Sequence, residues 1–516
     1  MPLTPAQQKA LTVIQQKQFT LVHGVTGSGK TEIYLQAAAQ TIASGRQVIV
    51  LVPEISLTPQ TIQRFAERFP IAVLHSALTP KERRDNWQKI SRGEVQLVVG
   101  ARSALFAPFA RPGLIIIDEE QDSSYKQDNN PRYHAVRAAW RRAELCGAKV
   151  VLGTATPALE TFYLFQNPPD ERYGYVYLPQ RINGRPLPPV EIIDLRTELQ
   201  HGNFSVLSKK LQHELRVCLD ARGKAVIFLN RRGFASFISC RACGLALECP
   251  RCSVSLVYHS DGRAKCHYCG YEQTVPDKCP ACHSGYFKYF GTGTQKVETE
   301  LRKYFGDIQL FRMDGDTTEK RGAHARIIQD FLAADKAVLL GTQMIAKGHD
   351  FPEVTLVGII SADTLLNLPD FRAAERTFQL LTQAAGRAGR GARPGKVLVQ
   401  TYNPEHYAIQ AAAGHDYPGF YAQELAQRRE LNYPPFSRLT SLVFSAREET
   451  LARNMAQEYA LKYAPRVSGP APCILRRLRG FYRWQILLKD VSVNYADFPA
   501  ESPVRIELDV DPLNMY

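Results

Sequence analysis

The chain has 516 residues, of which 45% are hydrophobic and 22% are charged, a composition typical of a soluble globular protein with about three or four domains. Extensive disorder is excluded, and so is a membrane span, because apolar runs such as Val48–Val52 and Leu114–Ile117 are only as long as strands. The 64 Lys and Arg residues exceed the 50 Asp and Glu residues and give a formal net charge of +14. This excess indicates either a polyanionic partner or simply high solubility.

Short apolar runs alternate with helix-like segments from residue 18 to about residue 165. We expect buried parallel strands at Phe19–His23, Gln47–Val52, Ala72–His75, Val95–Gly100, Gly113–Asp118 and Lys149–Gly153. Helical patterns lie between them, at Thr31–Ser44, Pro59–Phe69 and Pro80–Ser91. This alternation predicts a doubly wound α/β domain over residues 1–166.

The rest of the chain divides into four parts. Residues 167–205 are poorer in pattern and contain Pro186, Pro188 and Pro189, which is typical of a linker. A second α/β domain is predicted over residues 206–239 and 284–403, and a cysteine-rich stretch, residues 240–283, interrupts it. Its elements are expected at Ser208–Ala221, Ala225–Asn230, Ile308–Met313, Ala337–Gly341, Val354–Ser361 and Lys396–Thr401. Residues 404–516 mix both patterns, and we expect a small α+β domain there.

A phosphate-binding loop follows the first predicted strand. The residues Gly24, Val25, Thr26, Gly27, Ser28, Gly29, Lys30 and Thr31 form a complete G-x-x-x-x-G-K-T motif between a strand and a helix. Backbone N–H groups of such a loop surround phosphate oxygens, and the helix N-terminus favours the same anion. Lys30 can reach the β- and γ-phosphates of ATP, and the Thr31 hydroxyl can ligate Mg²⁺.

Acidic and basic side chains supply the rest of a predicted hydrolytic site. Asp118 and Glu119 follow a buried strand, so Asp118 would hold Mg²⁺ and Glu119 would activate water. An exposed acidic turn is the alternative. Further along, Gln383, Arg387 and Arg390 form Q-x-x-G-R-x-G-R, whose arginines suit one helix face and the charge of a transferring phosphoryl group. A solvated basic helix is the alternative for that segment.

Eight of the 11 cysteines form four C-x-x-C pairs. They are Cys240/Cys243, Cys249/Cys252, Cys266/Cys269 and Cys279/Cys282. Eight thiolates predict two closed, structural Zn²⁺ sites. A predicted hairpin between Cys252 and Cys266 brings the two inner pairs together, which favours one zinc on the inner four cysteines and the other on the outer four. We expect His259, His267 and His283 to be bystanders, and Cys146, Cys218 and Cys473 to be ordinary thiols.

The segments around these motifs carry a family resemblance. They are Leu51–Gln60, Gly100–Pro108, Asp118–Gln127, Phe228–Gly233, Gly341–Pro352, Gly480–Lys489 and Asp509–Pro512. Together with the four cysteine pairs, they resemble the PriA (primosomal protein N′) family of replication-restart helicases in superfamily 2. The resemblance implies two RecA-like P-loop helicase lobes, an embedded two-zinc module that separates strands and docks partners, and a C-terminal α+β domain.

Several residue roles are implied by this resemblance. Gln7 would contact adenine, and Gly348 and Asp350 would contact nucleotide from the second lobe. The DNA strand would follow Pro53, Glu54, Arg102, Ser103 and Thr342. Ser123–His134 looks like an aromatic-rich loop in which Tyr125 and Tyr133 could stack on bases, with core packing as the alternative for either tyrosine.

A basic and aromatic segment lies near the end of the chain. It contains Arg476, Arg477, Arg479, Phe481, Tyr482, Arg483 and Trp484. Such interleaving suits contact with a nucleic-acid backbone together with stacking on bases. A charged surface strand is the alternative.

Two features depart from the family pattern. Family members usually have an N-terminal region that holds a nascent 3′ end and a winged helix, whereas Lys30 lies only 29 residues after Met1. We therefore expect this chain to lack those modules through loss, truncation or a misassigned start. The position after the acidic stretch, usually His, is Gln121, whose amide can still form bridging hydrogen bonds.

The expected function is that of an ATP-dependent 3′→5′ DNA helicase that remodels stalled forks and starts primosome assembly. The implied partners are forked and single-stranded DNA, single-stranded DNA-binding protein and primosome proteins, with no membrane. We expect a monomer in the cytoplasm, associated with the nucleoid. A loading platform with little or no ATPase activity is one alternative, and a duplex translocase or RNA helicase is another. Only the resemblance supplies the strand polarity and the preference for DNA.

Overall fold

The computed structural model describes most of the chain, and all structural statements concern these residues. They are residues 3–53, 59–182, 184–229, 238–252, 254–259, 262–285, 287–289, 294–306, 308–314, 317, 323–342, 345, 351, 353–391, 393–499 and 501–513. The chain forms two compact units, one essentially Met1–Pro188 and the other Pro189–Gln343 with Pro352–Tyr516.

The first unit is built on a seven-stranded parallel sheet with the strand order β3-β4-β2-β5-β6-β1-β7. The strands are β1 (Phe19–Gly24), β2 (Gln47–Leu51), β3 (Ile71–Leu74), β4 (Leu97–Gly100), β5 (Pro112–Asp118), β6 (Lys149–Thr154) and β7 (Tyr173–Leu178). All six strands predicted in this region are confirmed. Their central runs are apolar without alternation because helices cover both faces of the sheet.

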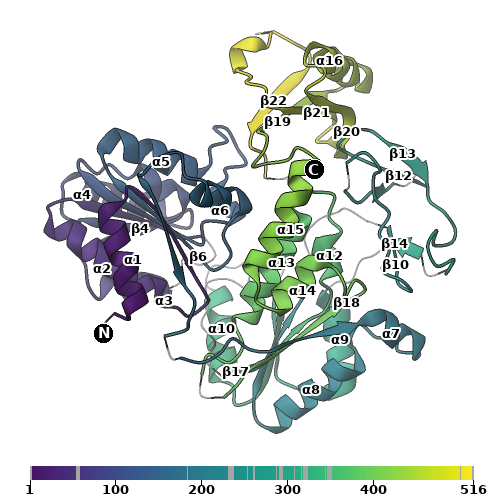
Figure 1. Cartoon of the computed structure of the whole chain (residues 1–516), viewed down its shortest axis with the longest axis horizontal. Coiled ribbons are helices and arrows are strands. Elements are labelled where there is room, and N and C mark those ends of the chain that lie inside the picture. The colour runs from purple at the N-terminus through teal and green to yellow at the C-terminus, as the bar shows by residue number, and fades with distance from the viewer. Residues whose placement is uncertain are drawn as a thin grey trace. The chain divides into compact units, whose positions relative to one another are not determined.

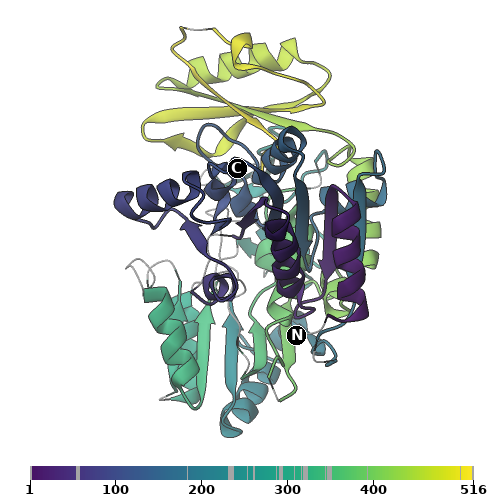
Figure 2. The same cartoon turned by 90° about the vertical axis from the view of Figure 1, so that its left-hand side faces the viewer.

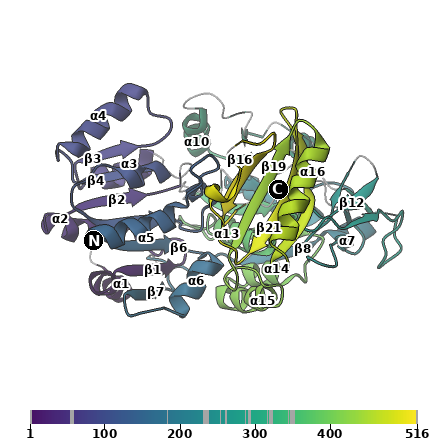
Figure 3. The ribbon, with the colours of Figure 1, turned by 90° about the horizontal axis from the view of Figure 1, so that it is seen from above.

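Six helices and two short 3₁₀ turns accompany this sheet in the described residues of the unit. They are α1 (Pro5–Gln16), α2 (Lys30–Ala43), α3 (Pro59–Ala66), α4 (Pro80–Ser91), α5 (Ala135–Cys146), α6 (Leu159–Gln166), η2 (Arg102–Phe106) and η3 (Ser123–Tyr125). Helices α1 and α2 share a core with one face of the sheet, and α5 packs on β5 and β6 (Figure 3). The unit is therefore the predicted doubly wound layout.

The second unit contains a six-stranded parallel sheet with the order β15-β16-β9-β17-β18-β8. Its strands are β8 (Val190–Asp194), β9 (Lys224–Phe228), β15 (Leu310–Met313), β16 (Ala337–Gly341), β17 (Val354–Ile359) and β18 (Lys396–Thr401). Its helices are α7 (Leu195–Gln200), α8 (Lys209–Asp220), α9 (Thr294–Phe305), α10 (Ala323–Ala333), α12 (Asp363–Leu366) and α13 (Ala373–Ala385) (Figure 1). The second α/β domain is thus confirmed.

The stretch predicted as a linker, residues 167–205, is mostly structured. Its strand β7 pairs with β1, and β8 pairs with β18. Helix α7 follows β8 directly. The three prolines that suggested a linker lie between β7 and β8, so only this short connection fits the prediction.

The cysteine-rich module and the C-terminal domain complete the second unit. The module holds the antiparallel pair β10 (Ile238–Cys240) and β14 (Phe287–Tyr289), and a small sheet of β11 (Val257–Tyr258), β12 (Arg263–Lys265) and β13 (Glu272–Thr274). The C-terminal sheet has the antiparallel order β20-β21-β19-β22. Its elements are β19 (Leu439–Ala446), α16 (Glu449–Lys462), β20 (Val467–Leu478), β21 (Phe481–Lys489), η4 (Tyr495–Asp497) and β22 (Arg505–Val510). Helix α16 covers one face of this sheet (Figure 2).

The C-terminal domain begins later in the chain than predicted. Helices α14 (Tyr407–Ala413) and α15 (Tyr417–Glu430) fall in the predicted range 404–516, but they pack against α13 of the second lobe. The antiparallel sheet begins only at Leu439. Within the described residues, no helix combines the length and apolarity needed to cross a membrane.

Candidate nucleotide site and metal centres

The predicted phosphate loop connects β1 to α2. Gly27 and Gly29 have φ angles of +88° and +79°, which L side chains rarely adopt, so the loop needs glycine at both positions. Lys30 is the first residue of α2, and its Nζ donates to the carbonyl oxygen of Gly24 at 2.8 Å. The loop is therefore closed on itself by the lysine that is predicted to contact phosphates.

Gln7 lies beside the loop, at the start of α1. Its Oε1 accepts from the backbone N–H of Thr4 at 2.9 Å, and its Nε2 donates to the carbonyl oxygen of Ser28 at 3.1 Å. Gln7 is buried. A residue 21 positions away in sequence is thus attached to the loop, and its contact with adenine stays a prediction.

Of the two predicted acids, Asp118 ends β5 and Glu119 follows the strand. Burial and repulsion from Glu119 raise the pKa of Asp118, while Lys30 and Tyr34 oppose that rise. The charge of Lys30 thus acts on the carboxyl group of Asp118. Glu119 has a φ angle of +49°, a strained conformation for a residue with a side chain.

Tyr34 is a site residue that sequence reasoning missed. Its hydroxyl donates to Asp118 Oδ1 at 2.9 Å, and a Cβ at Gly153 would overlap that hydroxyl. Tyr34 stands four positions after Lys30 on α2. That spacing puts the two side chains on one helix face and is the signal that could have identified it.

Gln121 links the acidic pair to the next strand of the sheet. Its Nε2 donates to Glu119 Oε2 at 2.7 Å, and its Oε1 accepts from the Thr154 hydroxyl at 2.6 Å. Thr154 ends β6. The glutamine that departs from the family pattern thus forms hydrogen bonds on both sides within the first unit.

The aromatic-rich loop places its two tyrosines differently. Tyr125 is fully buried, and its hydroxyl lies 2.6 Å from the carbonyl oxygen of Asp118, so the alternative of core packing holds for it. Tyr133 is half-buried beneath the Arg102 guanidinium, 5.9 Å from its ring centre. Arg102 also donates to the carbonyl oxygen of Ser124 at 2.9 Å. This residue, which is predicted to contact the DNA strand, thus stabilises the conformation of the loop.

The remaining residues of the predicted path are only partly described. Pro53 is buried, Ser103 is exposed and Thr342 is half-buried. Glu54, Gly348 and Asp350 lie outside the described residues. Their predicted roles stay predictions.

The second unit places the glutamine and arginines of Q-x-x-G-R-x-G-R at the end of α13. Gln383 is buried in the last turn of the helix, and Gly386 caps it. Arg387 and Arg390 therefore lie in the turn beyond the helix, not on a helix face as expected. Arg390 Nε donates to the carbonyl oxygen of Gly386 at 2.8 Å, while Arg387 is largely buried.

The eight paired cysteines form two clusters, in the nested arrangement predicted. One consists of Cys240, Cys243, Cys279 and Cys282, and the other of Cys249, Cys252, Cys266 and Cys269. Within each cluster the sulfur atoms all lie within 4.8 Å of one another. Measured Sγ–Sγ distances of 3.5–3.6 Å are close to the roughly 3.8 Å spacing of a tetrahedral zinc–thiolate site. Both clusters therefore fit Zn²⁺.

The C-x-x-C turns whose following residue lies in the described part of the chain share one backbone geometry. The residue after the second cysteine, Gly244, Gly270 or His283, has a positive φ angle. Its N–H donates to the carbonyl oxygen of the first cysteine at 2.8–3.0 Å. This turn points both thiols of a pair to the same side, which is why the short C-x-x-C spacing suits a metal ligand pair.

The turn of Cys266–Gly270 joins the module to its neighbours in the second unit. His267 Nδ1 lies 2.7 Å from the carbonyl oxygen of Pro472, and Gln485 Nε2 donates to the carbonyl oxygen of His267 at 2.6 Å. The Tyr268 hydroxyl accepts from the backbone N–H of Phe371 at 3.3 Å. The inner cysteine cluster is therefore packed between the C-terminal sheet and the second lobe.

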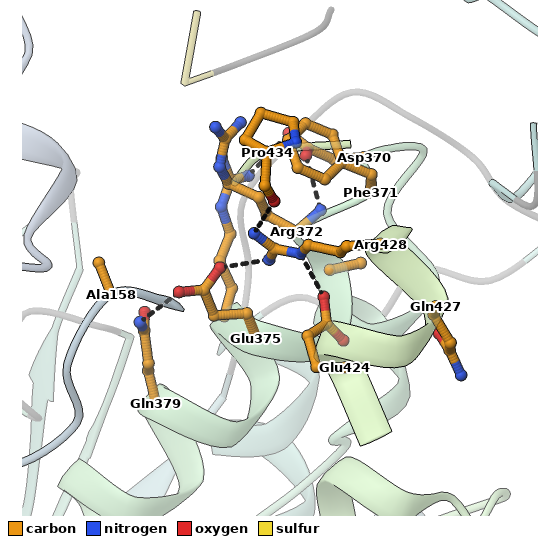
Figure 4. A network of polar contacts seen from close by, with 12 residues as sticks. Ala158, Asp370, Phe371, Arg372, Glu375, Gln379, Glu424, Gln427, Arg428 and Pro434 are labelled. Atoms are coloured by element: carbon orange, nitrogen blue, oxygen red, sulfur yellow. Dashed lines mark hydrogen bonds and ion pairs between the residues drawn. The ribbon is translucent and has the colours of Figure 1, made fainter. Parts of the chain in front are cut away.

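A buried ion network lies nearby, between α13 and α15. Arg428 Nη2 binds Glu375 Oε2 at 2.5 Å, Nε binds Glu424 Oε1 at 2.8 Å, and Nη1 donates to the carbonyl oxygen of Pro434 at 3.2 Å (Figure 4). All three charged side chains are at most 5% exposed. The spacing of Glu424 and Arg428, four residues apart on α15, is visible in the sequence, whereas Glu375 joins them only in the tertiary fold.

The basic and aromatic segment near the end forms the hairpin of β20 and β21. Arg476 binds both carboxylate oxygens of Glu449, at 3.0 and 2.8 Å. The guanidinium of Arg477 lies over the Tyr482 ring. These contacts order an exposed surface with several arginines.

Family models match four parts of the chain. They are the DEAD/DEAH box helicase model over residues 4–164, the helicase conserved C-terminal domain over 287–392, the PriA DNA helicase Cys-rich region over 249–273, and the primosomal protein N C-terminal domain over 429–513. These ranges cover most of the first α/β lobe, part of the second lobe, the inner cysteine cluster and the antiparallel sheet.

Curated relatives match over the whole chain. The replication restart protein PriA of Bacillus subtilis (strain 168) is 47% identical, with 100% of this chain and 67% of the relative covered. The PriA proteins of Synechocystis and Treponema pallidum are 46% and 43% identical over 99% of this chain, and 65% and 80% of their own lengths are covered. The chain thus spans about two thirds of the first two relatives. With this identity and the P-loop lobe, second lobe and paired cysteine clusters in place, the chain belongs to the PriA family of replication restart proteins.

Proposed function

We propose that the chain is an ATP-driven DNA helicase that moves 3′→5′ on single-stranded DNA, remodels stalled or abandoned replication forks and begins primosome assembly. The observation that carries the proposal is the convergence of Lys30, Asp118 and Glu119 at one edge of a parallel sheet, beside a complete phosphate loop. Membership of the PriA family is the support for the proposed strand polarity, the preference for forked DNA and the partners.

Different residues of the first lobe would bind the nucleotide, hold the metal ion and activate water. Backbone N–H groups of the loop and the Lys30 ammonium would hold the phosphates, and Gln7 would hold the adenine edge. Thr31 and Asp118 would hold Mg²⁺, which supplies charge neutralisation on the phosphates. Glu119 would accept a proton from the attacking water, with Gln121 fixing its carboxylate through the 2.7 Å hydrogen bond.

The second lobe would complete the site. We propose that Gln383, Arg387 and Arg390 act on the transferring phosphoryl group, and that Gly348 and Asp350 contact the nucleotide. Arginine stabilises the charge that develops on that group. Closing and opening of the two lobes during each ATP cycle would move the chain along DNA.

The partners proposed are forked and single-stranded DNA, single-stranded DNA-binding protein and primosome proteins. The two cysteine clusters would each hold a structural Zn²⁺, because four thiolates leave no open coordination position for catalysis. We further propose a monomer that works on the nucleoid in the cytoplasm.

ATP hydrolysis with and without forked DNA tests the proposal. Forked DNA should stimulate hydrolysis by the purified chain, and Lys30→Ala should lower the stimulated rate about 100- to 1000-fold, as loss of one charge-stabilising donor does. Lys9→Ala, a lysine on the exposed side of α1, serves as the control and should leave the rate unchanged. Zinc and DNA binding without hydrolysis would instead favour a loading platform.

A further inference from the structure

The segment that follows β7 lies directly against the phosphate loop. The N–H of Val25 donates to the carbonyl oxygen of Leu178 at 3.1 Å, and the N–H of Ile182 donates to the carbonyl oxygen of Gly27 at 3.0 Å. Strand β7 also pairs with β1, so that Leu178 lies opposite Gly24. Residues 178–182 are therefore fixed to the loop by backbone hydrogen bonds at both ends.

Arg181 reinforces this attachment. Its side chain is largely buried, and its Cγ and Cδ lie 3.5 and 3.8 Å from the position that a Cβ on Gly27 would take. The aliphatic stem thus packs along the outer face of Gly27. This packing leaves the next residue, Ile182, with little freedom to move away from the loop.

Ile182 exposes an apolar side chain at the edge of the loop. It is 55% exposed, although its backbone is fixed. A Cβ built on Gly29 would collide with both Ile182 Cδ1 and Gln7 Nε2. The isoleucine methyl and the glutamine amide therefore converge on the same glycine, one residue before Lys30.

The amide of Gln7 keeps capacity for a ligand. Its Oε1 accepts one hydrogen bond, from Thr4, and its Nε2 donates one, to Ser28. One acceptor lone pair and one N–H of the side-chain amide are left, the pair that an adenine edge can use. An edge-on contact of this kind holds a base in its plane but does not cover its face.

We propose that Ile182 is the apolar platform for the face of the nucleotide base, next to Gln7, and that residues 178–182 form a wall of the nucleotide site. The inference rests on the proposed ATP-dependent function. The proposed contact of Gln7 with the base puts the base of a nucleotide bound at the loop beside Gly29, where the Gln7 amide lies. There Ile182 removes one face of the base from water, whatever the base, while Gln7 selects its edge.

Binding of ADP and of inorganic tripolyphosphate, each with Mg²⁺ and measured by calorimetry, tests the platform. Ile182→Ala should weaken ADP binding about five- to tenfold, since three buried carbon atoms are lost, and should leave tripolyphosphate binding unchanged. Ile182→Leu keeps the volume and should bind ADP nearly as the unmodified chain does. Val217→Ala, at a half-exposed site on α8, is the matched control for truncating a surface aliphatic side chain.

Two results would overturn the inference. One is unchanged ADP binding in Ile182→Ala, and the other is an equal loss of both ligands, which would mean that Ile182 only supports the loop. Either result leaves the proposed function standing, provided that the unmodified chain binds ADP. Failure of the unmodified chain to bind ADP would instead contradict the ATP-dependent function itself.

Discussion

At the scale of single residues, the carboxylate of Asp118 is held by a side chain outside the motifs. The Tyr34 hydroxyl fixes Oδ1 at 2.9 Å, and Gly153 leaves the space for it. Tyr34→Phe keeps the ring and removes only this hydrogen bond. Because partners that orient a metal ligand strongly affect metal affinity, we expect the Mg²⁺ concentration for half-maximal ATP hydrolysis to rise about tenfold. A Mg²⁺ titration measures it, and Mg²⁺-dependent ADP binding gives a readout without turnover.

The matched control for this prediction is Tyr177→Phe, which removes a hydroxyl from a tyrosine that is 47% exposed on β7. Its Mg²⁺ dependence should equal that of the unmodified chain. A lower maximal rate in Tyr34→Phe at an unchanged Mg²⁺ requirement would mean that the tyrosine does not position the metal ligand.

His23, the residue before the phosphate loop, predicts a pH dependence of stability. Burial, and then the charge of Lys30, lower the pKa of His23 to about 3. Below pH 6.5 the imidazole of His23 binds a proton in the unfolded chain but stays neutral in the folded chain. The free energy of unfolding therefore falls as the pH falls, by about 1.4 kcal/mol per pH unit. Between pH 6.5 and pH 4.5 we expect His23 to account for a loss of about 2–3 kcal/mol.

Urea unfolding of His23→Gln at both pH values isolates this contribution, because the other titrating groups cancel in the comparison. The variant should lose about 2–3 kcal/mol less than the unmodified chain. His201→Gln, at an exposed histidine, should behave like the unmodified chain. Equal losses in all three proteins would contradict the assignment to His23.

At the scale of elements, each C-x-x-C turn supplies two thiols to one cluster. Cys249→Ser removes a ligand from the inner cluster only, and the zinc content measured by mass spectrometry should fall from about two ions per chain to about one. Cys146→Ser, at the exposed cysteine outside both clusters, should leave it unchanged. An unchanged content in Cys249→Ser would mean that the inner four cysteines hold no zinc.

The elements that the sequence predicts well are those with a local cause. The six first-lobe strands that were predicted are apolar runs because helices cover both faces of the sheet, and the cysteine turns are set by spacing within a few residues. Strand β7 was missed because it lies at the sheet edge, where tyrosines alternate with smaller residues in Tyr173–Leu178. The helix predicted to carry Arg387 ends earlier, at a glycine whose effect the periodicity does not show.

At the scale of the whole molecule, the second unit depends on contacts between segments far apart in the chain. Arg428 of α15 binds Glu375 of α13, Glu424 of its own helix and the carbonyl oxygen of Pro434, just before the C-terminal sheet. The ring of Phe371 lies beneath the same guanidinium at 5.1 Å and stacks on Tyr433 at 4.5 Å. The second lobe and the C-terminal domain are therefore joined around one buried cation.

Arg428→Met tests how much this junction contributes to stability. The substitution preserves much of the buried volume but leaves two carboxylates without their cation, so we expect the free energy of unfolding of the second unit to fall by about 3–5 kcal/mol. Arg438→Met breaks an ion pair whose arginine is 61% exposed and should cost less than about 1 kcal/mol. Adding Glu375→Gln and Glu424→Gln to Arg428→Met should recover part of the loss, because the stranded charges are removed. Urea unfolding compares the three variants, and an equal effect of Arg428→Met and Arg438→Met would show that the buried network does not hold the unit together.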